Sequence, residues 1–215
     1  MHALKLAIFT GTAFSRMCTL MVFCLASWAC SAETEVPSET EKPVIEKQAN
    51  PKVMMETTLG NVTIELFPKK APASVENFIA YVESGHYNGT IFHRIIPNFM
   101  AQGGGYDTKM NKKSTRSPIV NESTNGLKNV RTTLSMARTM DPDSATAQFF
   151  INFVNNASLD GSKGRPGYAV FGRVVAGMSV VDSMAVQPQG AQGGVFVNAP
   201  NTPIVIEKAY ILKNK

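Results

Sequence analysis

The segment 92–105, FHRIIPNFMAQGGG, constrains the fold of this chain more than any other stretch. Apolar residues flank Arg94 on both sides, which predicts a half-buried strand. Pro97-Asn98 then predicts a turn into a second strand at residues 99–102. A cation among apolar neighbours needs a partner or has a function, because burying an unpaired charge is costly. For the residue alone, the ordinary interpretation is an arginine whose side chain reaches the surface or pairs with a carboxylate.

Residues 1–32 have the pattern of a secretory signal peptide. Lys5 and Arg16 supply its positive region, and the apolar run 18–28 is too short for a comfortable membrane span. Small residues follow, so cleavage after Ala29 or Ala32 fits the pattern. An uncleaved N-terminal anchor is one alternative. Lipidation of Cys30 is another, which Trp28 disfavours because a small residue is expected at that position.

All three cysteines of the chain lie in this leader. The mature chain would therefore contain no disulfide, no thiol nucleophile and no thiolate metal site. With the short leader, this composition leads us to expect a bacterial protein of the periplasm. Four Asn-x-Ser/Thr sequons, at residues 61, 88, 121 and 156, would matter only in a glycosylating pathway.

The charge balance argues against a nucleic-acid partner. Of the 21 basic residues, two leave with the leader, so 19 basic residues face 16 acidic ones in the mature chain. Residues 33–51 carry five glutamates and three prolines, and we expect a flexible acidic tether there. A specific partner for the tether is the minor alternative. We expect the folded domain at residues 52–215.

Within that domain, short strands outnumber helices. Residues 53–57 and 61–67 flank a turn at Leu59-Gly60 and predict a β-hairpin. Residues 71–85 predict a helix whose single apolar stripe plugs a sheet or barrel, and residues 178–186 predict a second helix. Further strands are expected at 133–137, 148–152, 168–175 and 202–212, separated by long loops at 106–131, 138–147 and 155–167. This pattern favours a barrel or a sandwich.

Several sequence segments resemble the cyclophilin family of peptidyl-prolyl cis-trans isomerases. They are LSMAR (134–138), QFFI (148–151), LDG (159–161) and AVFGRVVAGM (169–178), together with the segment 92–105. The resemblance covers residues 53–212 and is greatest for the periplasmic bacterial branch. It implies a mainly-β fold, a closed eight-stranded antiparallel β-barrel capped by two α-helices. It also implies an active site on the outer face, without a metal or an organic cofactor.

The resemblance also assigns roles to individual residues. It implies that Arg94 is catalytic and that Gln102 orients it and holds the substrate backbone. The implied proline pocket consists of Phe99, Met100, Phe150 and Leu159, with Tyr168 where many relatives carry histidine. Gln148 matches a further position that faces the substrate. Ala137, Arg138 and Thr139 match the segment whose backbone pairs with the residue before proline.

One departure from the family pattern affects ligand binding. Many eukaryotic members have a tryptophan where this chain has Ser158. The missing indole removes a wall and a hydrogen-bond donor, so we predict weak binding of the family's inhibitor cyclosporin. The loop 138–147 is polar and charged where many relatives are rich in glycine and asparagine, which leaves the sequence preference around proline open.

Other chemistries fit the residues poorly. The mature chain has only His86 and His93 and no cysteine, which disfavours nucleophilic catalysis and a metal site. We interpret His93 as a structural, hydrogen-bonding residue that alternation turns away from Arg94. The three glycines 103–105 are not followed by a lysine of a phosphate loop, so they indicate close backbone approach at a bend. The basic cluster 109–116 is expected to be a solvated loop, with attraction to an acidic surface as the alternative.

Two functions remain open. The first is an enzyme that isomerises X-Pro bonds of exported proteins during folding, with Arg94 stabilising a twisted amide. The second is a non-catalytic chaperone or adaptor module that binds proline-containing segments.

Overall fold

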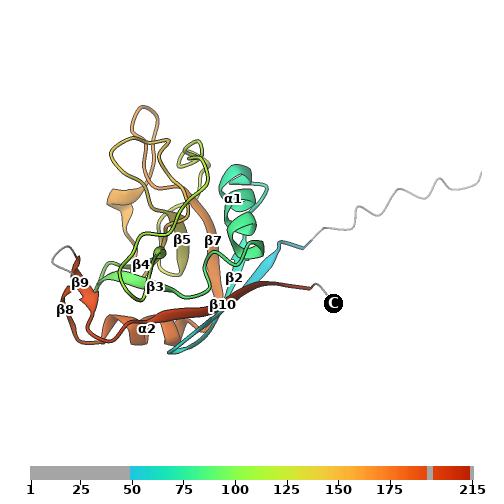
Figure 1. Cartoon of the computed structure of the whole chain (residues 1–215). Coiled ribbons are helices and arrows are strands. Elements are labelled where there is room, and N and C mark those ends of the chain that lie inside the picture. The colour runs from blue at the N-terminus through green and yellow to red at the C-terminus, as the bar shows by residue number, and fades with distance from the viewer. Residues whose placement is uncertain (1–48, 193–195, 214–215) are drawn as a thin grey trace, which may run out of the picture. The chain divides into compact units, whose positions relative to one another are not determined.

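A computed structural model of the chain describes residues 49–192 and 196–213 (Figure 1). The predicted leader 1–32 and most of the predicted tether 33–51 lie outside the described residues. The last residues of the tether segment already contact the domain. Asn50 Nδ2 donates to Glu65 Oε1 at 3.2 Å, and the Pro51 carbonyl accepts from the Leu66 N–H at 2.9 Å.

Eight antiparallel strands close into a barrel in the order β1-β10-β3-β4-β6-β5-β7-β2 (Figure 1). This confirms the predicted mainly-β class and the closed barrel. The strands are β1 Lys52–Thr57, β2 Gly60–Leu66, β3 Thr90–Ile96, β4 Met100–Asp107, β5 Thr133–Met136, β6 Phe149–Asn152, β7 Val170–Ala176 and β10 Val205–Leu212. The predicted hairpin is formed by β1 and β2, in which Val62, Ile64 and Leu66 alternate into the core.

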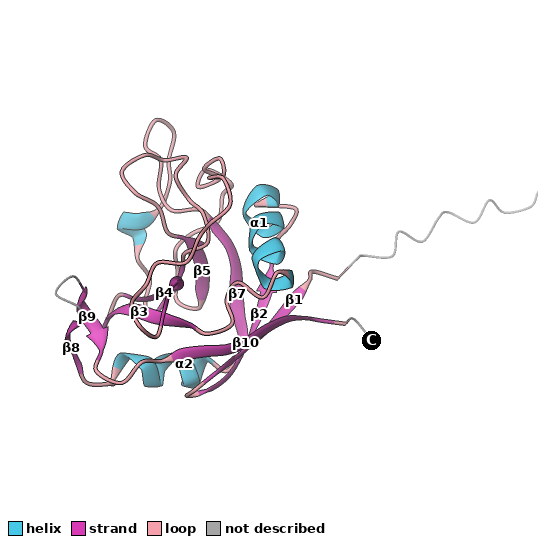
Figure 2. Cartoon of the chain, in the orientation of Figure 1, coloured by secondary structure: helices cyan, strands magenta, loops and turns pink. Residues whose placement is uncertain are grey.

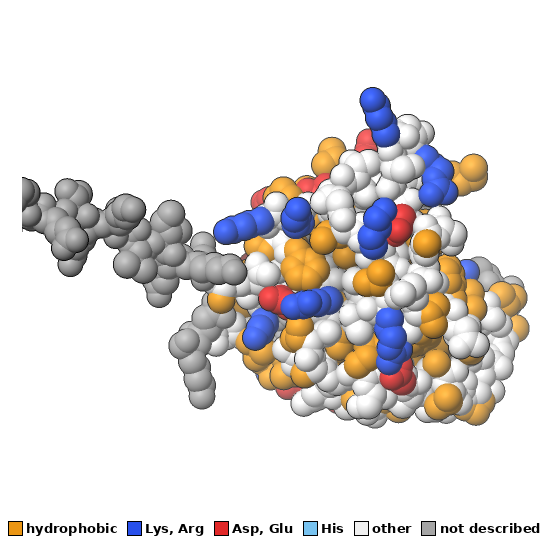
Figure 3. Space-filling model, turned by 180° about the vertical axis from the view of Figure 1, so that it is seen from behind, with side chains coloured by type: hydrophobic (Ala, Val, Ile, Leu, Met, Phe, Trp, Pro, Cys, Tyr) orange, Lys and Arg blue, Asp and Glu red, His pale blue; other side chains and the backbone are white. Residues whose placement is uncertain are grey.

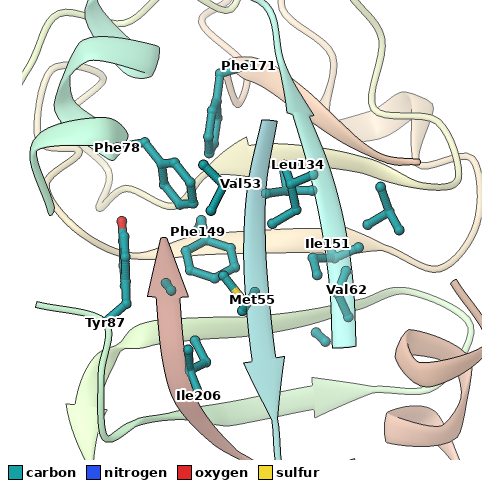
Figure 4. Packing of buried hydrophobic residues seen from close by; sticks show 14 of the residues in the cluster. Val53, Met55, Val62, Phe78, Tyr87, Leu134, Phe149, Ile151, Phe171 and Ile206 are labelled. Carbon is teal, nitrogen blue, oxygen red and sulfur yellow. The ribbon is translucent and has the colours of Figure 1, made fainter. Parts of the chain in front are cut away.

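Two helices pack against the barrel, as predicted (Figure 2). Helix α1, Pro72–Glu83, inserts Phe78 among the core aromatics, with ring centroids 5.1 Å from Tyr87 and 5.6 Å from Phe149 (Figure 4). Helix α2, Met178–Ala185, contributes the buried Val181 and Met184 to the same core. The apolar stripes read from the sequence therefore face the barrel interior.

Strand β4 is longer than predicted. It continues through the three glycines to Asp107 rather than ending at Gln102. At Gly104, where φ is +82°, an added Cβ would lie 2.8 Å from Tyr87 and 2.9 Å from Phe149. The predicted close backbone approach is thus confirmed, but it occurs inside a strand, because glycine lets core rings press on the backbone.

The sequence pattern did not predict the two-stranded sheet of β8, Gln189–Gln192, and β9, Phe196–Pro200. It follows α2 and packs Phe196 against His93 and Tyr106, at ring-centroid distances of 5.5 and 4.8 Å. This small sheet therefore covers part of the surface of β3 and β4.

On the molecular face in Figure 3, lysine and arginine side chains lie between apolar and acidic ones rather than in one continuous stripe. Among the described residues, the helices are all too short or too polar to cross a bilayer.

Candidate active site

A row of three polar side chains crosses adjacent strands of the barrel wall. Arg94 of β3 lies opposite Gln102 of β4 in the strand register. Arg94 Nη1 approaches Gln102 Oε1 at 3.4 Å, and Gln102 Nε2 donates to Gln148 Oε1 at 2.8 Å. The structure therefore brings together the two predicted catalytic residues and Gln148, with Gln102 in the middle of the row.

Arg94 is exposed, so the prediction of a half-buried cation was wrong. The side chains on either side of it are buried: His93 lies against β9 and Ile95 lies in the barrel core. In a closed barrel, the residues of each strand alternate between the interior and the exterior, and Arg94 lies on the exterior. The neighbours of Arg94 in the sequence are buried elsewhere and do not surround its side chain.

Gln148 is held close to the backbone of β4. An added Cβ on Gly105 would lie 2.5 Å from Gln148 Cγ, so the glutamine side chain occupies the space above this glycine. Residue 105 must therefore be a glycine for the Gln148 side chain to occupy this place in the polar row.

Beside the polar row lies a small apolar patch separate from the barrel core. Met100 and Phe150 are 2% and 4% exposed, yet neither belongs to the core cluster inside the barrel. The rings of Phe150 and Tyr168 meet edge-on, with centroids 5.6 Å apart. Phe99 and Leu159 are half-buried. These five are the predicted pocket residues.

The predicted backbone-pairing segment follows β5. The Ala137 N–H donates to the Gln148 carbonyl at 3.0 Å, and the Thr139 N–H donates to Ser144 Oγ at 2.9 Å. Among the described residues, no hydrogen bond is recorded for the N–H or C=O of Arg138. Of the three predicted residues, Arg138 therefore offers both backbone groups to an extended ligand.

A cavity of about 200 Å³ adjoins the polar row and this segment. Its lining residues are Gln102, Lys112, Thr115, Ala137, Arg138, Thr139, Ser144, Thr146 and Gln148. Lys112 places a positive charge of the basic cluster 109–116 at this cavity. The sequence pattern placed that cluster in a solvated loop and gave no signal that Lys112 lies beside the predicted site.

The two histidines of the domain take no part in the polar row. Burial lowers the pKa of His93 to about 4, an interaction with the Ile91 backbone opposes the shift, and the charge of Arg94 adds to it. Burial also lowers the pKa of His86, whose Nε2 lies 3.1 Å from the Gly104 carbonyl. The prediction that His93 is hydrogen-bonded fails at one atom, because its buried Nδ1 has no partner in the described structure.

A network of buried asparagines holds the backbone of the predicted pocket residues Phe99 and Tyr168, and the sequence pattern did not reveal it. Asn156 Nδ2 donates to the Phe99 carbonyl at 3.0 Å and to Asn152 Oδ1 at 2.7 Å. Asn129 Nδ2 donates to Asp160 Oδ1 at 3.2 Å and to the Tyr168 carbonyl at 3.3 Å. Asparagines in long loops are usually turn residues, so their sequence context predicts loops rather than a supporting network. In the described ranges no group of three or more histidine, cysteine, aspartate or glutamate side chains could hold a metal ion.

Comparison with known proteins agrees with this geometry. Residues 52–211 match the family model described as cyclophilin type peptidyl-prolyl cis-trans isomerase. A peptidyl-prolyl cis-trans isomerase of Acinetobacter baylyi is 55% identical over 158 residues, which cover 74% of this chain and 84% of that protein. Peptidyl-prolyl cis-trans isomerase A of Dickeya dadantii is 53% identical over 161 residues, covering 75% and 84%.

A solved structure is similar across the same domain. The crystal structure of a Cryptosporidium parvum cyclophilin type peptidyl-prolyl cis-trans isomerase, determined in the presence of the dipeptide Ala-Pro, superposes with a TM-score of 0.63. It is 28% identical, and the match covers 76% of this chain and 99% of that one.

Proposed function

The chain belongs to the cyclophilin-type peptidyl-prolyl cis-trans isomerases, a family of enzymes, and on this premise we propose that it isomerises X-Pro bonds with Arg94 as the fixed donor. The observation that carries the proposal is the row of Arg94, Gln102 and Gln148 beside the pocket of Met100 and Phe150. A cation and an apolar pocket side by side are what the isomerisation of a proline amide requires.

The chemistry needs no bond to the substrate. Rotation about an X-Pro bond breaks amide resonance, at a barrier of roughly 18–20 kcal/mol. In the twisted state the proline nitrogen regains its lone pair and can accept a hydrogen bond. A guanidinium aimed at that nitrogen stabilises the twisted state more than either planar state, and only such a difference accelerates the reaction.

Arginine suits this role because its guanidinium stays protonated and donates from a planar fork. Gln102 Oε1 accepts from that fork, and Gln148 in turn fixes the Gln102 amide at 2.8 Å. Each tenfold acceleration requires about 1.4 kcal/mol. A few hydrogen bonds that form fully only in the twisted state would therefore suffice for a large rate enhancement.

The apolar patch would grip the pyrrolidine ring while the preceding carbonyl rotates. The predicted pocket residues are Phe99, Met100, Phe150, Leu159 and Tyr168. Aromatic and thioether groups such as theirs contact a ring without requiring polar partners, and the meeting of the Phe150 and Tyr168 rings supports the assignment. The unpaired backbone groups of Arg138 would hydrogen-bond the residue before proline. Substrates are then proline-containing polypeptides in extended conformation.

The alternative is a binding module without catalysis. The contact between Arg94 and Gln102, at 3.4 Å, is longer than a typical N–H···O bond, and Arg94 is exposed. An arginine held this loosely would bind a proline segment without stabilising the twisted amide.

An isomerisation assay separates the two functions. The cis-to-trans rate of an Ala-X-Pro peptide is measured with the wild-type protein, with Arg94→Ala and with Arg94→Lys. We expect both variants to lose about a hundredfold or more in kcat/KM, as when an active site loses a key transition-state donor. Arg173→Ala, which removes an exposed arginine of β7 outside the site, is the control. Equal, background-level rates for wild type and Arg94→Ala would favour the binding module.

We also propose that the protein works on exported proteins in the periplasm. The support is the leader pattern of residues 1–32 and the confinement of all cysteines to it. Mass spectrometry of the protein purified from a periplasmic fraction should give an N-terminus at Cys30 or at Glu33, for cleavage after Ala29 or after Ala32. A mass that includes a lipid on Cys30 would indicate the anchored form, and a full-length chain in the cytoplasmic fraction would contradict export.

A further inference from the structure

The guanidinium of Arg138 makes three hydrogen bonds that leave none of its nitrogens without a partner. Nε donates to the Gly167 carbonyl at 3.0 Å, Nη1 to the Thr139 carbonyl at 2.8 Å, and Nη2 to the Pro166 carbonyl at 2.9 Å. Such charge-assisted bonds from a planar fork fix both position and orientation. The side chain therefore ties the loop after β5 to the loop before β7.

The same guanidinium stacks on an aromatic ring of the pocket. Arg138 Cζ lies 4.7 Å from the ring centroid of Tyr168, within the range of a cation–π contact. From another side, the Phe150 ring meets Tyr168 at 5.6 Å with an interplanar angle of 78°. Tyr168 thus lies between Arg138 and the buried floor of the pocket.

Tyr168 needs an anchor because of its position in the chain. It follows residues 162–166, which are all exposed, and precedes β7. Its backbone is fixed, since its N–H donates to the Leu159 carbonyl at 2.9 Å and its carbonyl accepts from Asn129 at 3.3 Å. Its ring, however, is only half-buried, and in the described structure the contacts recorded for it are those with Phe150 and Arg138.

We propose that Arg138 is a positioning residue that holds the Tyr168 ring as one wall of the proline pocket. The inference rests on the proposed function, since it takes this pocket as the proline site. By fixing the ring before the substrate arrives, Arg138 reduces the ordering that binding requires. The effect falls on substrate binding rather than on the twisting step, which Arg94 serves.

Lysine cannot replace this arginine fully. An ammonium places one charge over the ring, but it cannot direct three donors at the carbonyls of Thr139, Pro166 and Gly167 from one plane. Arg138→Lys should therefore keep part of the effect, and Arg138→Ala should lose it. An intermediate effect of Arg138→Lys would indicate that the charge over the ring positions Tyr168. Equal effects of the two variants would instead indicate that only the packing of the arginine side chain was lost.

The first experiment measures KM and kcat for an Ala-X-Pro peptide. We expect Arg138→Ala to raise KM about three- to tenfold with kcat changed less than twofold, and Arg138→Lys to fall between this variant and wild type. Arg173→Ala is the matched control, because its guanidinium also lies over a ring, that of Phe67 at 5.9 Å, away from the site. An unchanged KM in Arg138→Ala, with or without a lower melting temperature, would overturn the proposal.

A double-mutant cycle tests whether Arg138 acts through Tyr168. If it does, Arg138→Ala raises KM far less in a Tyr168→Ala background than in the wild type. Equal fold-changes in both backgrounds would show that Arg138 acts independently of the ring, and would overturn the proposal.

A third measurement does not depend on activity. In a protein labelled at tyrosine, the ring-proton NMR shifts of Tyr168 should change in Arg138→Ala, move less in Arg138→Lys and stay constant in Arg173→Ala. If the wild-type protein shows no isomerase activity, the proposed function fails. The NMR shifts still test whether Arg138 positions the Tyr168 ring. Unchanged Tyr168 shifts in Arg138→Ala would refute the proposal that Arg138 positions this ring.

Discussion

Among the described residues, Nδ1 of His93 is the one buried side-chain nitrogen or oxygen atom without a hydrogen-bond partner. The ring is 3% exposed and packs against Tyr106 and Phe196, at centroid distances of 4.7 and 5.5 Å. An imidazolium in this place would be desolvated and would face the charge of Arg94, so burial lowers the pKa of His93 to about 4.

Because this pKa lies below that of an unfolded histidine, the unfolded state binds more protons between pH 6.5 and about 4. The free energy of unfolding therefore falls as the pH drops through this window, by about 3 kcal/mol from this residue, and levels off below it. Denaturant titrations at pH 7 and pH 4.5 should show most of this loss in the wild type and a smaller one in His93→Gln. An NMR titration that gives His93 a midpoint near 6.5 would contradict the assignment.

Ser158 directly precedes the predicted pocket residue Leu159 in a short 3-10 helix, Ala157–Leu159, and is exposed. Ser158→Trp restores an indole beside Leu159, and a buried interfacial tryptophan commonly contributes 2 kcal/mol or more. We expect cyclosporin to bind this variant at least about tenfold more tightly than wild type, by isothermal titration. Ala157→Trp in the same helix is the control. Tight binding by the wild type would remove the basis for this prediction.

At the scale of elements, helix α1 shows an interaction that no local pattern predicts. Its N-cap is Ala71, and no side chain of the cap residue satisfies the first N–H groups. Glu122 does so from the long loop: Oε1 accepts from the Ala73 N–H at 3.0 Å, and Oε2 accepts from the Ser74 N–H at 2.8 Å and the Ser74 hydroxyl at 2.7 Å. A carboxylate there also complements the helix dipole.

Glu122→Ala should lower the free energy of unfolding by about 1–2 kcal/mol, the usual cost of a lost cap. Since α1 carries Phe78 into the barrel core, the loss should appear as a lower global melting temperature, about 2–4 °C per kcal/mol for a domain of this size. Glu76→Ala, an exposed position on the same helix, should change the melting temperature little. If the two variants melt alike, the long-range cap contributes nothing to stability.

The elements differ in how far the sequence predicts them. Both helices and the β1–β2 hairpin are predictable, because 3.6-residue and two-residue periodicities are local properties. The full length of β4 is not, because glycines 103–105 resemble a loop until the rings that press on them are known. The β8–β9 sheet is also missed, since its role is to cover His93, a residue about 100 positions earlier in the chain.

At the scale of the whole molecule, closure of the barrel decides where the site lies. The closed order places β3, β4 and β6 side by side, and so it aligns Arg94, Gln102 and the pocket residue Phe150 on neighbouring strands. The identities of these residues could be predicted from the family resemblance. The asparagine network and the hydrogen bonds of the Arg138 guanidinium could not, because both join loops that only the closed fold brings together.

Barrel closure also sets where the folded domain must begin. The Asn50 and Pro51 contacts join residues before β1 to β2, and β1 pairs with both β2 and β10. A chain that begins at Ala49 should therefore match a chain that begins at Glu33, with melting temperatures within about 2 °C, less than about 1 kcal/mol, and equal kcat/KM.

A chain that begins at Met55 lacks half of β1, including the fully buried Val53, and opens the barrel between β2 and β10. Opening it exposes two strand edges and part of the core, which exceeds the marginal stability of a domain. We expect this shorter chain to be unfolded or aggregated by circular dichroism and size-exclusion chromatography. A marked loss of stability already in the chain that begins at Ala49 would mean that the acidic tether contributes to the fold, because the two longer chains differ only in that segment.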